Sequence, residues 1–153
     1  MPDIGKKPPA LKGSTGDGSE LKLASLKGQW VVVYFYPKDS TPGCTNEAKD
    51  FRDLYPIFRQ RNAQIVGVSR DSQKSHANFA SKQELPFPLV SDPDETWCRA
   101  FDVIHEKLLY GKHHQGIVRS TFLIDPDGKL AREWRGVKVP GHAQAVLDAI
   151  PIA

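Results

Sequence analysis

Cysteine is scarce in this sequence: its 153 residues include two, Cys44 and Cys98, and no Cys-x-x-Cys pair. Two cysteines are too few for a disulfide-stabilised scaffold, and without the paired motif nothing indicates a dithiol redox centre or half of a zinc site. In a reducing compartment both side chains would remain thiols. Each cysteine therefore has to be judged by its own surroundings in the sequence.

Long apolar runs are missing as well. The longest, at residues 31–36, has the length of a strand, whereas a membrane-spanning helix needs about 20 apolar residues. The N-terminal sequence MPDIGKKPPALKG has no apolar core of the roughly 7–15 residues that a secretory signal requires. We therefore expect a cytoplasmic protein that does not enter a membrane.

Positive charge is not concentrated anywhere in the chain. The formal net charge is +3, and the Lys and Arg residues are scattered among acids instead of forming a basic block. Proteins that bind nucleic acid usually carry a clustered stripe of Lys and Arg. Nucleic acid is therefore not an expected partner.

The bulk composition is that of one globular domain. Hydrophobic residues make up 39% of the sequence and charged residues 25%, near the averages for folded proteins, and the length suffices for a single core. We predict one domain over residues 1–153. Because residues 8–19 are rich in Gly, Pro, Lys and Ser, about the first 20 residues are expected to form an N-terminal arm, with a turn at Gly16-Asp17-Gly18.

Apolar periodicity predicts a central strand followed by a helix. The run VVVYFY at residues 31–36 is typical of a strand that is covered on both faces, and Pro37 ends it. Apolar residues then recur at the i, i+3, i+4 and i+7 positions of one helical face. They predict a helix from about Cys44 to Gln60, with a kink at Pro56. The residues of this face are Phe51, Leu54, Tyr55 and Phe58.

The remaining apolar segments predict alternating strands and helices. Pro126-Asp127-Gly128 is a strong hairpin turn between the last two strands. This order predicts an α/β protein with a mixed central β-sheet flanked by helices, and it is compatible with a thioredoxin-like fold. The predicted strands are 21–26, 65–69, 87–90, 119–125 and 130–135, and the predicted helices are 72–83, capped by Ser72, 95–101 and 143–150.

Cys44 occupies a position that favours a reactive thiolate. It follows the predicted central strand and a short loop, and it opens a helix. The end of such a strand is where α/β proteins usually build sites, and a helix start offers unpaired N–H groups and positive dipole charge. A free thiol of pKa ~8.5 is only roughly 3% ionised at pH 7, and the thiolate is the nucleophile. Since a helix end alone is a weak activator, we expect a cation nearby.

The motif around this cysteine resembles a known family. Pro37, Thr41 and Cys44, within PKDSTPGC, match the P-x-x-x-T/S-x-x-C signature of peroxiredoxins. The longer string YFYPKDSTPGCTNEAKDFRD resembles the subgroup called bacterioferritin comigratory protein or peroxiredoxin Q. The segments VGVSRDS, FPLVSDPDE, CRAFDV, YGK and GIVRSTFLIDPDGK agree with this likeness. The resemblance implies a thioredoxin-like fold and a thiol-dependent peroxidase of antioxidant defence, acting on hydrogen peroxide and organic hydroperoxides.

The same resemblance implies roles for individual residues. Cys44 would attack the peroxide and become a sulfenic acid. Arg119, in the segment RSTFLID, would be the expected cation and would stabilise the thiolate and polarise the peroxide. The Thr41 hydroxyl would orient the peroxide, and Pro37 would shield the thiolate from water. The resemblance further implies a monomer, and no cofactor is expected because cysteine chemistry carries the electrons.

The chain departs from its subgroup at the resolving cysteine. Some members carry it five residues after the nucleophile, where this chain has Lys49, and others carry it in the next helix, at the position of Ala80. Cys98 stands among apolar neighbours and is expected to be a buried core thiol. We therefore expect thioredoxin, glutaredoxin or a small thiol to reduce the sulfenic acid. Resolution by Cys98 stays open, as does the origin of Ala80, natural or introduced in place of a cysteine.

Metal, hydrolase and sensor functions are weaker readings of the same residues. His113 and His114 are adjacent, so their side chains would not converge on one metal, and His76, His105 and His142 share no ligand spacing with a cysteine. No metal site is expected. A Cys-His hydrolase would need one of these histidines brought to the cysteine, and no hydrolase signature accompanies it. A non-enzymatic redox sensor would stop after about one equivalent of peroxide, whereas an enzyme turns over.

Overall fold

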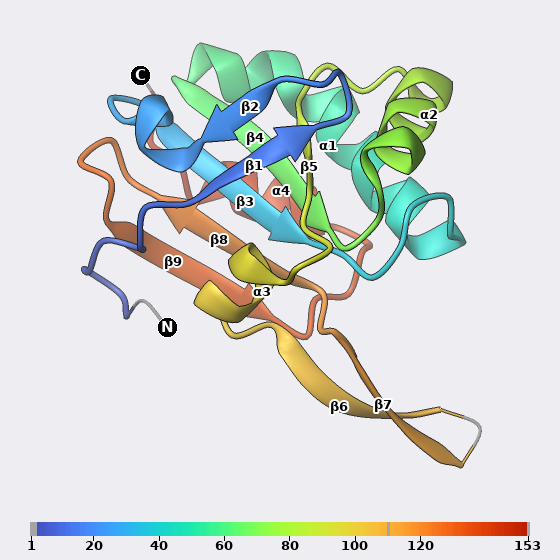
Figure 1. The fold of residues 1–153 in the computed structure, drawn as a ribbon. Helices are drawn as coiled ribbons and strands as arrows, with labels where there is room; N and C mark the ends of the chain where they lie inside the picture. The colour runs from blue at the N-terminus through green and yellow to red at the C-terminus, as the bar shows by residue number, and fades with distance from the viewer. Residues whose placement is uncertain (1–2, 110, 153) are drawn as a thin grey trace.

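A seven-stranded mixed β-sheet organises the chain in the computed structural model, which describes residues 3–109 and 111–152 (Figure 1). The strand order is β2-β1-β5-β4-β3-β8-β9, and a separate two-stranded hairpin consists of β6 and β7. The sheet strands are β1 Lys12–Thr15, β2 Glu20–Lys22, β3 Trp30–Phe35, β4 Ala63–Ser69, β5 Leu89–Ser91, β8 Ser120–Ile124 and β9 Leu130–Arg135. The hairpin strands are β6 Ile104–Leu109 and β7 Lys112–Ile117.

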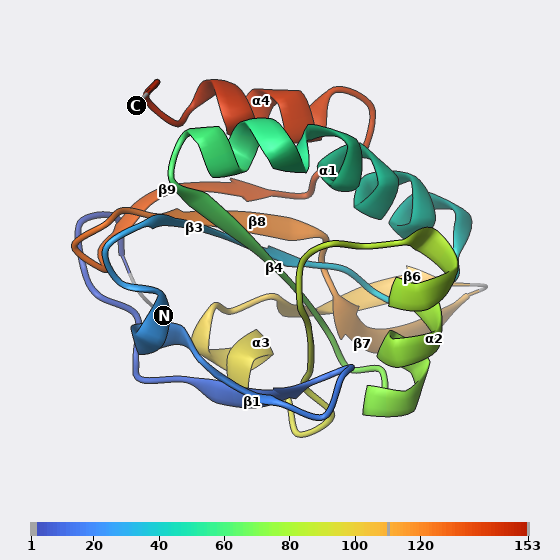
Figure 2. The same ribbon diagram turned by 90° about the horizontal axis from the view of Figure 1, so that it is seen from above.

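Helices cover both faces of this sheet. Their bounds are α1 Pro42–Gln60, α2 Gln73–Gln83, α3 Thr96–Ala100 and α4 His142–Asp148, with a 3₁₀ helix, η1, at Leu23–Leu26. Figure 2 shows α1 and α4 together on one side of the sheet and α3 on the other. Each side has its own apolar core, one containing α1, α2 and α4 and the other containing α3 and η1. The predicted mixed α/β sheet with flanking helices is confirmed.

Strand β3 is the central element, and its side chains supply both cores. It pairs parallel with β4 and antiparallel with β8. Because successive strand residues point to opposite faces, Val32 and Tyr34 lie in the core under α1, whereas Val33 and Phe35 lie in the core under α3. All four are fully buried. The sequence predicted a continuously apolar strand here, and the strand is apolar throughout because both of its faces are buried.

Helix α1 begins two residues before the predicted start, at Pro42, and ends at the predicted Gln60. Proline is well tolerated in the first turn because its missing N–H would have no intrahelical partner there. Pro56 lies inside the helix. The predicted apolar face is buried mainly through Phe51 and Phe58, and Phe51 stacks on the Tyr34 ring at a centroid distance of 4.8 Å.

Two segments near the N-terminus differ from the sequence prediction. The predicted strand 21–26 ends at Lys22 and continues as η1. A 3₁₀ turn places residues i and i+3 on one side, which lets both Leu23 and Leu26 pack on the core of α3. The predicted arm contains strand β1, which pairs with β2 across the expected turn and with β5. At that turn Gly18 has φ +86°, a conformation that favours glycine.

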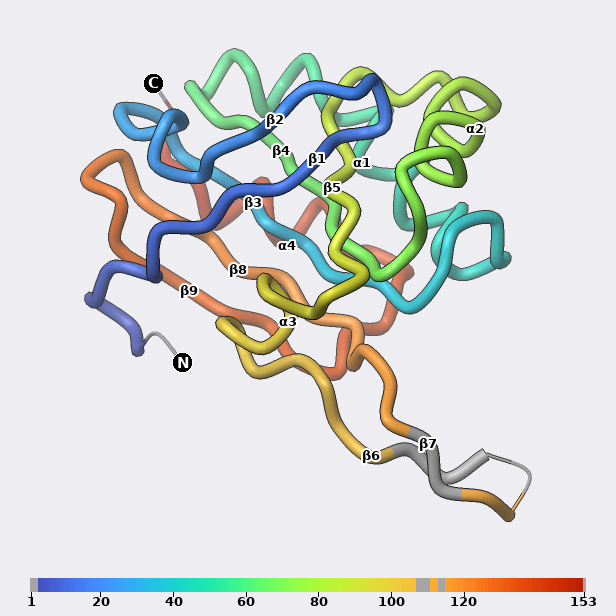
Figure 3. The backbone as a smooth tube through the Cα atoms, in the orientation of Figure 1, coloured from blue at the N-terminus to red at the C-terminus, as the bar shows by residue number. Residues whose placement is uncertain are grey.

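The hairpin of β6 and β7 runs away from the main sheet (Figure 3). Its base is fastened to the body by a hydrogen bond of 2.8 Å from the Val118 N–H to the Val103 carbonyl, and Ile117 is fully buried there. The sequence analysis did not anticipate these two strands. Among the described residues, no helix is both long and apolar enough to cross a lipid bilayer.

Replacing Phe51 by alanine is expected to destabilise the fold by about 3–5 kcal/mol, because a fully buried ring leaves a cavity under β3. Urea unfolding followed by circular dichroism would measure this change. Ile57→Ala is the matched control on the same helix, since Ile57 is 38% exposed, and it should cost less than about 1 kcal/mol. Equal losses in the two variants would contradict the packing role of Phe51.

Candidate active site

Cys44 lies in the first turn of α1, just beyond the end of β3. Only 2% of the surface of Cys44 is exposed to solvent. The first α-helical bond of this turn runs from the Thr45 N–H to the Thr41 carbonyl, at 2.8 Å. The N–H groups of the residues before Thr45 therefore have no intrahelical acceptor and are free to face an anion. The structure thus places Cys44 where the sequence predicted, at a helix start beside a strand end.

Arg119 reaches this sulfur from the neighbouring strand. It directly precedes β8, and the antiparallel register pairs Ser120 with Phe35, the last residue of β3. This register brings the start of β8 next to the loop that carries Cys44. One guanidinium nitrogen of Arg119, Nη2, donates a hydrogen bond to Cys44 Sγ at 3.3 Å. The cation that the sequence analysis required therefore lies in contact with the thiol.

Gly43 makes room for that guanidinium. A Cβ atom at this position would lie 3.2 Å from Arg119 Nη2, a tighter approach than side chains normally adopt. A side chain at position 43 would require the guanidinium to shift by a few tenths of an ångström.

Glu47 is a member of the site that the sequence analysis missed. It lies one helical turn after Cys44, is 1% exposed, and its Oε1 accepts a hydrogen bond of 2.6 Å from Arg119 Nη1. Burial raises the pKa of Glu47 to about 7, although the neighbouring Arg119 opposes this shift. The signal was present in the sequence, because residues i and i+3 share a helix face and PGCTNE places a carboxylate at that offset.

The guanidinium of Arg119 is held firmly in its charged form. Burial alone would lower its pKa, but Glu47 and Cys44 beside it outweigh that effect and raise the pKa above the usual value. The site therefore contains a permanent cation in contact with two acidic groups. Such a partly desolvated charge acts more strongly on a neighbour than it would in water.

Thr41 and Pro37 flank the cysteine as the motif predicts, each in a half-buried position. Thr41 is the N-cap residue of α1, but its side chain makes no capping bond; its Oγ1 instead donates to the Lys38 carbonyl at 2.8 Å. The oxygen lone pairs of that hydroxyl remain able to accept a hydrogen bond from another molecule. Pro37 follows the fully buried end of β3 and offers no N–H to the loop.

A buried polar cluster fixes the loop between β3 and α1 to helix α2. Asp39 accepts hydrogen bonds from the hydroxyls of Tyr36 at 2.6 Å and Ser75 at 2.8 Å, and it pairs with His76 Nδ1 at 2.7 Å. The other ring nitrogen of His76 lies 2.9 Å from the Val90 carbonyl. Both ring nitrogens of His76 therefore lie at hydrogen-bond distance from an oxygen atom. Asp39 and His76 thus tie the cysteine loop to a neighbouring helix.

The same cluster is the group of described residues that comes nearest to a metal site. Potential ligand atoms of Asp39, Asp71 and His76 lie within 4.8 Å of one another. They are, however, engaged with each other and with nearby hydroxyls: His76 Nδ1 pairs with Asp39, and Asp71 Oδ2 accepts from Ser69 at 2.6 Å. This arrangement is a hydrogen-bonded anchor. The side chains of His113 and His114, considered above, lie outside the described residues.

Cys98 is fully buried in α3, as predicted for a core thiol. Burial, reinforced by Asp92, raises its pKa far above that of a free thiol. It belongs to the apolar core on the α3 side of the sheet, whereas Cys44 belongs to the core on the α1 side. Both cysteines are free thiols. The sheet itself therefore separates Cys44 from Cys98, and Ala80 of α2 packs on the same core as Cys44.

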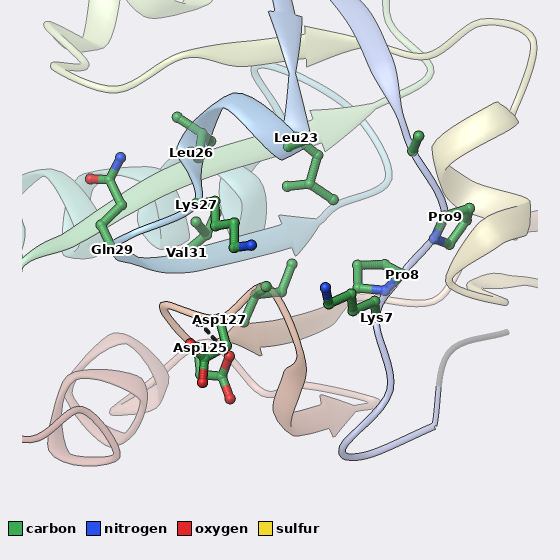
Figure 4. Close-up of a pocket in the computed structure, with 14 residues that line it drawn as sticks. Lys7, Pro8, Pro9, Leu23, Leu26, Lys27, Gln29, Val31, Asp125 and Asp127 are labelled. Carbon is green, nitrogen blue, oxygen red and sulfur yellow. Dashed lines mark hydrogen bonds between the residues drawn. The ribbon is translucent and has the colours of Figure 1, made fainter.

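An apolar pocket lies far from this chemistry. It has a volume of about 280 Å³ and lies at the other end of the sheet, where β3 begins and β8 ends. Leu23, Leu26 and Val31 line it, with Pro8 and Pro9 of the N-terminal segment along one side (Figure 4). None of the residues around Cys44 contributes to it. The candidate active site is instead a small, polar position at the start of α1.

A thioredoxin-like sheet with a cysteine at a helix start and an arginine on its sulfur is the arrangement of a thiol peroxidase. The chain belongs to the AhpC/TSA family, whose model matches residues 4–133. It is an enzyme of the peroxiredoxin type, which reduces peroxides with a cysteine thiol. The activity and the fold predicted from the sequence are thereby confirmed.

Similar proteins come from several bacteria. Peroxiredoxin Bcp of Xanthomonas campestris is 58% identical over 137 residues, covering 90% of this chain and 86% of that protein. Peroxiredoxin Bcp of Bacillus subtilis is 48% identical over 148 residues, covering 97% and 94%. A solved structure of the bacterioferritin comigratory protein of X. campestris superimposes with a TM-score of 0.90 at 55% identity, covering 96% of each chain.

The solved relatives also bear on Ala80. Two structures of the X. campestris peroxiredoxin Q are cysteine-to-serine mutants. The two mutated cysteines are separated in that sequence by the same number of residues as Cys44 and Ala80 in this one. This equal spacing supports the prediction that Ala80 stands where relatives have a second cysteine.

Glu47→Gln is expected to remove a pH dependence of stability. The ordinary pKa of Glu47 is 4.5 and the fold raises it to about 7, so between these values the folded protein holds a proton that the unfolded chain has lost. The associated stability is fully present below pH 4.5 and is lost as the pH rises through about 7, by roughly 3–4 kcal/mol at ~1.4 kcal/mol per unit.

Urea unfolding of both proteins across this pH range would measure the difference. The opposite contribution of His142, whose pKa is lowered to about 4 by burial and by Arg119, is common to both proteins and cancels. If the stability of the wild type and of Glu47→Gln fell in parallel as the pH rose, the pKa of Glu47 would have to be that of an ordinary surface carboxylate, and the prediction would be wrong.

Proposed function

We propose that Cys44 is the residue that reduces the peroxide. The contact that carries this proposal is the 3.3 Å hydrogen bond from Arg119 Nη2 to Cys44 Sγ. The thiolate sulfur attacks one peroxide oxygen, so that an S–O bond forms while the O–O bond breaks. Sulfur is oxidised to a sulfenic acid, and the second oxygen takes up a proton and leaves as water or an alcohol.

The neighbours of Cys44 divide the remaining work. The Arg119 guanidinium stabilises the thiolate and, as negative charge moves onto oxygen, the peroxide as well. The Thr41 hydroxyl accepts a hydrogen bond from the peroxide O–H and orients the O–O bond toward sulfur. Unpaired N–H groups of Gly43 and Cys44 stabilise the negative charge that develops on the peroxide oxygen. Pro37 keeps water from the sulfur without adding a competing donor.

An external thiol completes the cycle. Ala80 offers no sulfur, and Cys98 lies across the sheet in a different core. The first external thiol condenses with the sulfenic acid to a mixed disulfide and releases water; a second thiol then frees Cys44 and leaves as a disulfide. Thioredoxin, glutaredoxin and small thiols such as glutathione fit this role.

Both hydrogen peroxide and organic hydroperoxides are proposed substrates. The X. campestris relative that superimposes on this chain is described as having alkyl peroxide reduction activity. The reaction at Cys44 requires only an O–O bond. The substituent on the leaving oxygen therefore affects how the substrate fits the site and does not change the mechanism. The biological role proposed with it is antioxidant defence.

A monomer in the cytoplasm is the proposed state of the enzyme. Among the described residues, the large hydrophobic side chains that are exposed are Ile4, Ile57 and Ile152, which come from three separate segments. Scattered residues of this kind form no broad apolar patch that a stable partner would cover. Two free thiols are in keeping with a reducing compartment.

Cys44→Ser is expected to abolish peroxide consumption, because a hydroxyl is not ionised where the thiol is, whereas Cys98→Ser should keep a rate within about twofold of wild type. The measurement is consumption of hydrogen peroxide and of cumene hydroperoxide with a thioredoxin system or with glutathione. Many equivalents consumed per protein indicate an enzyme, and arrest near one equivalent would indicate a sensor. Turnover by Cys44→Ser would refute the assignment of the nucleophile.

Ala80→Cys is expected to convert the external cycle into an internal one. After one equivalent of peroxide, wild-type protein should react with a sulfenic-acid trap at Cys44, whereas Ala80→Cys should lose two hydrogens as a disulfide forms. Intact mass and peptide mapping distinguish the two products. Ala77→Cys is the matched control, since Ala77 of α2 is exposed and lies outside the core of Cys44. A disulfide between Cys44 and Cys98 in wild-type protein would overturn the external-thiol proposal.

A further inference from the structure

One guanidinium serves two buried acids in this site. Arg119 donates from Nη1 to Glu47 Oε1 at 2.6 Å and from Nη2 to Cys44 Sγ at 3.3 Å. Glu47 is 1% exposed and Cys44 is 2% exposed. Neither acid can be stabilised by bulk water in this closed arrangement. The charge on each of them therefore depends on what Arg119 can neutralise.

Among the described residues, the titratable groups that act on this pair add no second positive charge. His142 of α4 is neutral near pH 7, because burial and Arg119 lower its pKa to about 4. Tyr34 of β3 also stays neutral, since its burial raises its pKa well above the usual value. Asp50, further along α1, is another acid and is itself exposed. With both Glu47 and Cys44 ionised, the buried site would hold two anions against one cation, and a buried surplus charge is strongly unfavourable.

The second oxygen of Glu47 points to which acid keeps its proton. Glu47 Oε2 is buried and has no hydrogen-bond partner among the described residues. A carboxylate spreads its charge over both oxygens, so an unpartnered Oε2 penalises the ionised form more than a neutral carboxyl group. Cys44, in contrast, presents its sulfur to the guanidinium and to the N–H groups of a helix start. The surroundings thus favour a neutral Glu47 beside a thiolate.

We propose that Glu47 and Cys44 share a single negative charge opposite Arg119, with Glu47 holding a proton while Cys44 is the thiolate. Glu47 is then a positioning residue that sets how much thiolate is present at a given pH. This inference deepens the proposed function and rests on Cys44 as the nucleophile. Two acids coupled in this way titrate as a pair and not as independent groups.

The shared charge also balances the peroxidase step. When the thiolate attacks, sulfur becomes part of a neutral sulfenic acid and the departing oxygen needs a proton. Glu47 can then ionise, so the proton that it releases equals the one that the leaving group takes up. Thiolate, carboxylic acid and hydroperoxide become sulfenic acid, carboxylate and alcohol, with one negative charge on each side. Arg119 faces one anion before the step and one after it.

Alkylation of Cys44 by iodoacetamide as a function of pH tests the coupling, in a Cys98→Ser background so that one thiol reacts. Glu47→Gln keeps an oxygen acceptor for Arg119 but cannot ionise. Its alkylation midpoint should move to lower pH, by about one unit for charges on two residues one helical turn apart in a partly screened site. Arg119→Ala should move the midpoint to higher pH, since the shared cation is lost.

Asp50→Asn is the matched control, because it removes one carboxylate from the same helix without touching Arg119. Its midpoint should stay within about 0.3 units of the parent, as expected for an exposed and screened charge. An unchanged midpoint in Glu47→Gln, or a shift to higher pH, would show that Glu47 merely anchors Arg119 and would overturn the proposal. A shift of equal size in Asp50→Asn would do the same, by making the effect one of net charge.

A reciprocal measurement leaves Glu47 in place and removes any concern about the fold of the variants. Infrared spectra of the protein, assigned by loss of the carboxyl band in Glu47→Gln, follow the protonation of Glu47. Once iodoacetamide has turned Cys44 into a neutral thioether, Glu47 should ionise at a pH lower by the same amount, because coupling is mutual. Identical titration before and after alkylation would overturn the proposal. Peroxide turnover by Cys44→Ser, tested separately, decides the proposed function itself.

Discussion

The hydrogen bond between Arg119 and Cys44 joins two segments that lie 75 residues apart in the chain. It exists because β8 pairs antiparallel with β3, in a register that sets Ser120 against Phe35. Moving that register by one residue would turn the side chains of β8 to the other face of the sheet. The buried rows of β3 and β8 hold the register, so the apolar cores on both sides position the guanidinium. The same strand register therefore determines both the packing of the cores and the position of Arg119 beside Cys44.

A second set of contacts holds the cysteine side of the site. The loop between β3 and α1 could not keep Cys44 in place by itself, since such a loop contributes little burial of its own. Asp39 anchors it to α2 through His76, and the Ser72 side chain caps that helix by accepting from the Ser75 N–H at 3.1 Å. Cys44 is thus held in place at the helix by Glu47, through Arg119, and at the loop by Asp39. Both anchors are buried carboxyl groups.

Much of this architecture could be predicted from the sequence, and the exceptions have a common cause. The apolar run of β3 and the helical face of α1 are local patterns, and the motif from Pro37 to Cys44 is local as well. The cap at Ser72 was predicted for the same reason. Strand β1, in contrast, reads KGST and has no apolar alternation; it is a strand because β2 and β5 pair with it. The contact of Glu47 with Arg119 likewise depends on distant strand pairing, which no local pattern reveals.

In the proposed cycle, the burial of Cys44 separates its two reaction partners by size. A hydroperoxide presents two small oxygen atoms and can meet the sulfur within the closed site. A protein reductant must bring a whole thiol-bearing surface to the same atom, and the first turn of α1 with its anchored loop stands in the way. In the proposed cycle, oxidation of Cys44 would thus take place in the closed conformation, and reduction by a protein thiol in an opened one. In the proposed cycle, reduction by a protein thiol would then depend on how often the loop leaves helix α2, a step that peroxide concentration does not affect.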